Sequence, residues 1–68
     1  MEKYYVNTKA QSNGDHEVHT SKCQYLPSTE HRKYLGEFSS CDAAVRAAKD
    51  IYPKSNGCKT CSDACHTS

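Results

Sequence analysis

The segments HTSKC (residues 19–23) and CKTC (residues 58–61) constrain this chain more than any other part of its sequence. Each segment places two metal-type ligands a few residues apart, and thiolate sulfur with imidazole nitrogen is a donor set that a tetrahedral zinc ion takes. Closing the long stretch between the two pairs through one ion would couple metal binding to folding. We therefore predict a Zn²⁺ site with four ligands, His19, Cys23, Cys58 and Cys61.

The remaining cysteines and histidines form a second tier of candidates. Cys41, Cys65 and His66 are reserve ligands, because any of them could replace one member of the predicted set. Cys41 stands where a helix is expected to begin, so it is either a small buried residue or a thiol made reactive by the helix N-terminus. His16 and His31 lie among polar and charged neighbours and are expected to be solvated surface side chains.

The chain is too short and too polar to be stabilised by a hydrophobic core alone. It has 68 residues, of which 35% are hydrophobic, with no Trp, and its mean hydropathy is −0.92. Such a chain buries little apolar surface and usually needs a cross-link. We expect one domain, residues 1–68, held together by a metal or by disulfides.

The five cysteines are also compatible with three alternatives to a metal site. A disulfide-stapled small secreted domain would leave one cysteine unpaired, which weighs against a complete disulfide framework. A redox Cys-x-x-Cys normally opens a helix in a larger βαβ unit, and covalent haem would need an apolar pocket. We therefore favour the metal over all three.

Charge and targeting signals say little about partners. The net charge is +1 with Lys and Arg scattered among acids, so no basic face for nucleic acid is evident. The first residues lack the apolar core of a secretory signal, and no stretch is long enough to cross a membrane. We expect a cytoplasmic monomer that does not insert into a membrane.

The first half of the chain predicts strands. Tyr4–Thr8 and Glu17–Thr20 alternate as in a β-hairpin, with a turn over Ser12–Asp15. After a loop at residues 28–33, Tyr34–Phe38 predicts a third short strand, and its Gly36 indicates a bulge.

The second half predicts one helix and a knuckle. Ser39 or Ser40 can cap the helix, and Pro53 ends it. Its apolar stripe consists of Ala44, Val45, Ala48, Ile51 and Tyr52. Asn56-Gly57 predicts a sharp turn into the Cys-x-x-Cys, with a short helix over residues 62–66. The expected fold is small α+β: a β-hairpin plus a third short strand packed on one α-helix, with a C-terminal zinc knuckle.

The ordered pattern over about residues 16–62 resembles a known family. The segments Val18–Pro27, Tyr34–Phe38 and Asn56–Cys61, with an alanine-rich helix before the last, are similar to the Ada-type metal-binding domain of bacterial alkylation-repair regulators. In that family a Cys-x-x-x-Cys and a Cys-x-x-Cys hold zinc, and the first cysteine accepts a methyl group from a DNA phosphotriester. Here His19 stands in that first position. The resemblance thus implies the zinc scaffold and argues against methyl transfer.

Two classes of function follow. The first is a non-enzymatic zinc-binding module, with the metal used for structure, that serves as a protein- or DNA-binding accessory domain through Tyr4, Tyr5, Tyr25 or Tyr34. The second is a thiol-reactive DNA-repair or sensor protein in which a cysteine is modified. Hydrolytic catalysis is disfavoured, because it would require three protein ligands and a bound water.

Overall fold

Alternating side chains near the N-terminus form the predicted hairpin in the computed structural model, which describes residues 1–66. β1 (Glu2–Asn7) pairs antiparallel with β2 (His16–Thr20), with Val6 opposite Val18. The connection turns at Gly14, whose φ of 92° favours glycine. The last two residues of the predicted domain, 67–68, lie outside the described residues.

β3 (Arg32–Phe38) pairs antiparallel with the other edge of β1 and contains the predicted bulge. Tyr4 faces Gly36 while Tyr5 faces Tyr34, so one extra residue of β3 is accommodated between them. Gly36 has a φ of 127°, a backbone conformation that residues with a side chain rarely adopt, so the bulge favours glycine here. The strand begins earlier than predicted, directly after a 3₁₀ turn, η1 (Thr29–His31), that lies in the expected loop.

The prediction of a hairpin plus one strand is wrong, because the sheet has a fourth strand. β4 (Ser55–Gly57) pairs parallel with β2, and the strand order is β3-β1-β2-β4. The predicted turn at Asn56-Gly57 is therefore a buried strand. Local turn preference is overridden here because the backbone of residues 55–57 pairs with residues 16–18, more than thirty-five residues earlier.

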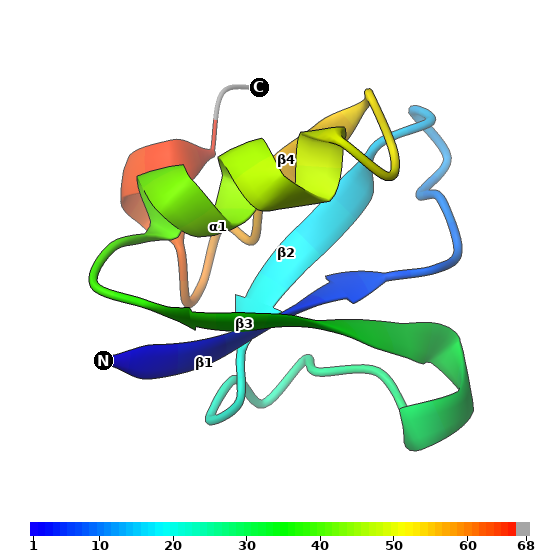
Figure 1. Cartoon of the computed structure of the whole chain (residues 1–68). Coiled ribbons are helices and arrows are strands. Elements are labelled where there is room, and N and C mark those ends of the chain that lie inside the picture. The colour runs from blue at the N-terminus through cyan, green and yellow to red at the C-terminus, as the bar shows by residue number, and fades with distance from the viewer. Residues whose placement is uncertain (67–68) are drawn as a thin grey trace.

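The helix α1 (Cys41–Lys49) follows β3 and lies across one face of the sheet, whereas the connection from β2 to β3 runs on the other side (Figure 1). Ser40 is its N-cap residue, as predicted, although its side chain makes no capping hydrogen bond. Ile51 lies beyond the end of α1 and is 42% exposed, so it does not belong to the buried stripe. The buried core residues come from β1, β2 and α1: Tyr4, Val6, Val18, Ala44 and Ala48.

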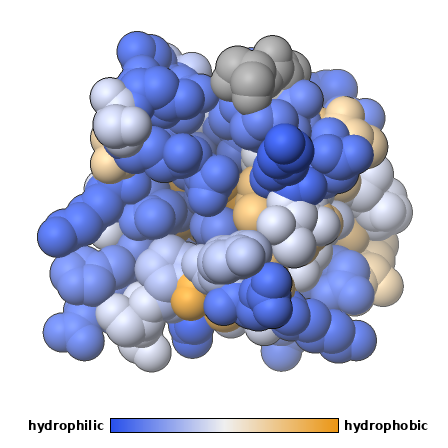
Figure 2. Space-filling model, turned by 180° about the vertical axis from the view of Figure 1, so that it is seen from behind, coloured by the Kyte–Doolittle hydropathy of each residue, from blue (hydrophilic) through white to orange (hydrophobic). Residues whose placement is uncertain are grey.

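The last element within residues 1–66 is a second 3₁₀ turn, η2 (Asp63–Cys65), which packs beside α1 and β4. Figure 2 shows the molecule from behind, where hydrophilic residues cover most of the surface and apolar ones appear only in small areas. No helix within residues 1–66 has the length and apolar character needed to span a bilayer. The small core agrees with the expectation that cross-links contribute much of the stability.

Candidate metal site

The end of β2 and the turn after it present the first pair of predicted ligands. His19 lies on β2, and its side chain is 1% exposed. The chain then turns back, because the N–H of Cys23 donates to the carbonyl of Thr20 (3.2 Å) and the N–H of Leu26 donates to the carbonyl of Cys23 (3.1 Å). These bonds return the Cys23 sulfur toward the histidine.

The end of β4 presents the second pair. The N–H of Cys58 donates to the carbonyl of Val18 (2.9 Å), which continues the pairing of β4 with β2 and anchors the knuckle to the sheet. The N–H of Ser62 donates to the carbonyl of Cys58 (2.8 Å), which closes a turn that contains Cys61. The unpredicted fourth strand is thus the element that places the Cys-x-x-Cys beside the hairpin.

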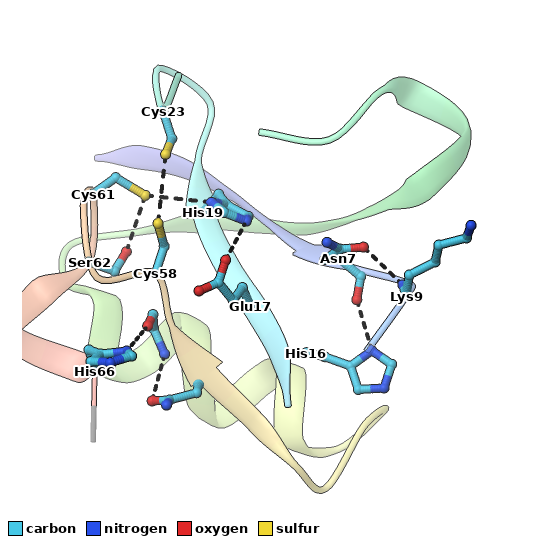
Figure 3. Close-up of polar contacts among 12 residues, drawn as sticks. Asn7, Lys9, His16, Glu17, His19, Cys23, Cys58, Cys61, Ser62 and His66 are labelled. Atoms are coloured by element: carbon cyan, nitrogen blue, oxygen red, sulfur yellow. Dashed lines mark hydrogen bonds and ion pairs between the residues drawn. The ribbon is translucent and has the colours of Figure 1, made fainter. Parts of the chain in front are cut away.

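The four side chains converge on one point (Figure 3), and their ligand atoms all lie within 4.8 Å of one another. The Sγ atoms of Cys23 and Cys58 are 3.8 Å apart, and Sγ of Cys61 lies 3.9 Å from Nδ1 of His19. A tetrahedral zinc ion with Zn–S bonds near 2.3 Å would separate two sulfurs by about 3.8 Å. The cluster therefore has the donor set and the spacing of a tetrahedral metal site.

Two hydrogen-bonding groups surround the Cys61 sulfur. The backbone N–H of Thr20 donates to Sγ of Cys61 (3.4 Å), and Oγ of Ser62 lies 3.8 Å from the same atom. Burial raises the pKa of the Cys61 thiol, but hydrogen bonds from Thr20, Cys23, Ser62 and Cys58 outweigh it, so the net pKa lies below the usual value. The surroundings of Cys61 therefore stabilise its thiolate form.

Cys23 behaves in the opposite way. Burial, followed by the neighbouring sulfurs of Cys61 and Cys58 and opposed by a backbone hydrogen bond from Tyr25, raises the pKa of Cys23 to about 12. Crowded sulfurs do not all ionise together, because each thiolate disfavours the next. A cation at the centre would remove that repulsion, as metal binding to thiolates requires.

His19 is oriented with one nitrogen toward the sulfurs and the other toward a carboxylate. Its Nε2 lies 3.6 Å from Oε1 of Glu17 and has no hydrogen-bond partner among residues 1–66. Burial lowers the pKa of His19, and Glu17 only partly offsets this. A neutral imidazole with Nδ1 free to bind is the form that a metal needs, and a carboxylate beyond a histidine ligand is a common second partner.

The reserve ligands lie elsewhere. Cys41 and Cys65 are joined by a disulfide, and Nδ1 of His66 lies 3.0 Å from the carbonyl of Gly57. The free cysteines are Cys23, Cys58 and Cys61. Disulfides and a metal are alternatives at the level of the sequence, whereas the structure combines one disulfide with one Cys/His cluster, which accounts for the odd number of cysteines.

The histidines outside the cluster differ from each other. His31 is exposed, as expected. His16 is half-buried instead of solvated: its ring stacks on Tyr52 at 3.9 Å between centroids, and its Nδ1 lies 2.9 Å from the carbonyl of Asn7. This contact joins the start of β2 to the segment after α1.

Sequence reasoning missed two residues beside the cluster, Glu17 and Thr20. Glu17 precedes His19 by two positions on a strand, and alternation places both on one face, so its role could have been inferred. The N–H bond from Thr20 to Cys61 depends on tertiary contact and leaves no sequence signal. Comparison with family models, with curated proteins and with solved structures finds no match for this chain.

Proposed function

We propose that this chain is a small zinc-stabilised module of the Ada-like type, in which the metal is structural and the protein is not an enzyme. The convergence of three sulfurs and one imidazole nitrogen within 4.8 Å carries this proposal. The ligands in this proposal are His19, Cys23, Cys58 and Cys61. The site joins the C-terminal end of β2 to the segment that follows the neighbouring strand β4, and so links the two halves of the chain.

Zinc is the metal that this donor set favours. Three thiolates and an imidazole are soft or borderline ligands, which disfavour magnesium and calcium, and a tetrahedral arrangement of such ligands is typical of Zn²⁺. The distances between ligand atoms agree with this geometry. Zinc also suits a structural role because it has no redox chemistry of its own.

Four protein ligands support a structural site over a catalytic one. A catalytic zinc keeps an open position for water or substrate, and a saturated site does not. Cys58 is 3% exposed, which reduces the access of an alkylating reagent. The Cys61 sulfur accepts a backbone hydrogen bond, which lowers its nucleophilicity. The histidine in place of the reactive cysteine of the Ada family argues in the same direction.

We propose that the module serves as an accessory domain that contacts a protein or a nucleic acid. Tyr25 and Tyr34 are 60% and 51% exposed and can supply aromatic contacts. Tyr4 was expected to contact a partner, but it is 6% exposed and belongs to the core, so it is not available for this role. Tyr5 is half-buried beneath the guanidinium of Arg32, whose Cζ lies 4.8 Å from the ring centroid.

Metal titration tests the structural proposal. Zinc added to the metal-free 68-residue chain should bind with a stoichiometry of one and increase the dispersion of the amide NMR spectrum. Co²⁺ should replace it and show tetrahedral d–d bands. Cys58→Ser should abolish these signals, whereas Thr60→Ala, an exposed change in the same turn, should leave them intact. Unchanged spectra on metal addition would refute a structural site, and rapid alkylation of a ligand cysteine in the zinc form would favour the thiol-reactive class.

A further inference from the structure

A second sulfur site lies on the side of the knuckle that faces the helix. Cys41 is the first residue of α1, and its partner Cys65 belongs to η2. The disulfide spans 24 positions of sequence, and the CKTC segment lies inside that span. It therefore fastens η2 to the helix independently of the metal cluster.

The two sulfurs have different surroundings. Sγ of Cys65 lies 3.2 Å from Oδ1 of Asp42, a residue in the first turn of α1. Cys41 is half-buried and Cys65 is 8% exposed. Cys65, but not Cys41, lines an open cavity of about 250 Å³, through which a small molecule can approach it. The other residues that line this cavity are Asp42, Val45, Arg46, Lys49 and Ala64.

The charges around this cavity favour the binding of a negatively charged small molecule. Arg46 and Lys49 are exposed side chains of the same helix, and together they outnumber the single carboxylate of Asp42. Local positive charge raises the concentration and the encounter rate of small anions. An open cavity with two basic residues and a disulfide-bonded cysteine in its lining has the parts of a site for a small anionic thiol.

We propose that the Cys41–Cys65 disulfide is a thiol–disulfide exchange site that reacts, through this cavity, with a small thiol carrying negative charge. The thiolate of the small molecule attacks Sγ of Cys65, a new S–S bond forms there, and Cys41 leaves as a thiolate. A second small thiolate then attacks the small molecule's sulfur in this mixed disulfide, and Cys65 leaves as a thiolate. The two protons of the small thiols end on the cysteines, and the two small thiols leave as their disulfide.

The fold supports this order of events. Cys41 leaves at the N-terminus of a helix of 9 residues, where the positive end of the dipole stabilises a thiolate. In the oxidised protein Sγ of Cys65 already lies 3.2 Å from Oδ1 of Asp42, so this carboxylate can accept a hydrogen bond from the S–H group that reduction creates. The reaction is reversible, so the small disulfide can restore the bridge. The metal cluster takes no part, because none of its four ligands belongs to this pair.

Mass mapping of the first exchange step tests the proposal. The oxidised, zinc-loaded 68-residue chain is treated with a limiting amount of glutathione, quenched with acid, and analysed by tandem mass spectrometry. We expect glutathione on Cys65 in preference to Cys41, with zinc still bound. The double variant Arg46→Glu/Lys49→Glu should slow the reaction with glutathione by about threefold or more, and should leave the rate with neutral β-mercaptoethanol unchanged. The control Lys9→Glu/Lys33→Glu, which reverses two charges outside the cavity lining, should react as the wild type does.

Three results would overturn the proposal. The first is a mixed disulfide that forms equally on both cysteines or only on Cys41. The second is an equal effect of the charge reversal on the anionic and the neutral thiol. The third is a second zinc ion in native mass spectra of the reduced protein, because the donor atoms of Cys41, Asp42 and Cys65 lie within 4.8 Å of one another and would then form a metal site instead.

Discussion

The backbone N–H of Thr20 donates a hydrogen bond to the sulfur of Cys61, which lies 41 positions further along the chain, at 3.4 Å. This bond joins the two halves of the candidate metal site before any ion is considered. It also supplies a fixed positive dipole to a sulfur that must carry negative charge as a ligand. The strand β2 therefore provides one candidate ligand, His19, and a hydrogen bond to another, Cys61.

The carboxylate of Glu17 is the charged group next to Nε2 of His19, so Glu17→Gln should weaken zinc binding by roughly tenfold. The amide keeps an oxygen near Nε2 of His19 and loses the charge that favours a metal-bound imidazole, since the two groups are 3.6 Å apart. Competition with a chromophoric chelator measures the affinity. Glu37→Gln, an exposed change on β3, is the matched control and should bind zinc as the wild type does. Equal affinities for all three proteins would show that Glu17 has no influence on the metal.

Zinc affinity should rise with pH. Without metal, Cys23 holds its proton because burial and the adjacent sulfurs raise its pKa to about 12. Zinc must displace that proton, so the apparent dissociation constant should fall by about tenfold per pH unit for each proton released, from about pH 6 to about pH 8. Burial lowers the pKa of His19, so its proton competes with zinc only toward acid pH. Calorimetry in two buffers of different ionisation enthalpy counts the protons, and a binding enthalpy that is independent of buffer would contradict this prediction.

Gly57→Ala should destabilise the fold by about 1–3 kcal/mol, because the site has no room for a side chain. A Cβ atom there would lie 2.7 Å from Cβ of Cys65 and 2.7 Å from the carbonyl oxygen of Ser62. Relief of this clash requires the segment after the knuckle to move away from β4. Urea unfolding of zinc-loaded protein measures the loss, and Thr60→Ala serves as the neutral control. A variant as stable as the wild type would mean that β4 and η2 do not pack closely in solution.

Removal of the disulfide should lower the unfolding free energy of oxidised protein by about 3 kcal/mol, since the bridge closes a loop of 24 positions in the unfolded chain. The double variant Cys41→Ala/Cys65→Ala should still bind one zinc ion, because the four clustered ligands remain. Denaturant unfolding gives the stability, and native mass spectrometry gives the metal content. Reduced wild type should unfold like the double variant. Loss of zinc from the variant would show that the bridge is needed to assemble the metal site.

Local patterns in the sequence were sufficient for the hairpin, the bulge at Gly36, the start of the helix and the choice of the four clustered side chains. Alternation, turn residues and helical periodicity act over a few residues, and ligand pairs at short spacing are visible without a fold. The same reasoning paired His19 with Cys23, and the structure places both side chains in the cluster. The identity of the metal and the role of the module stay predictions.

Contacts between distant segments determined the rest. The parallel pairing of β4 with β2 makes Asn56 and Gly57 a buried strand, although both residues favour turns, because the backbone bonds available there exceed the local preference. The partner of Cys41 depends on where η2 docks, which no spacing reveals. Tyr4 is buried and Tyr34 exposed for the same reason: a pattern of alternation gives two faces, and the position of the helix and the edge of the sheet decide which is covered.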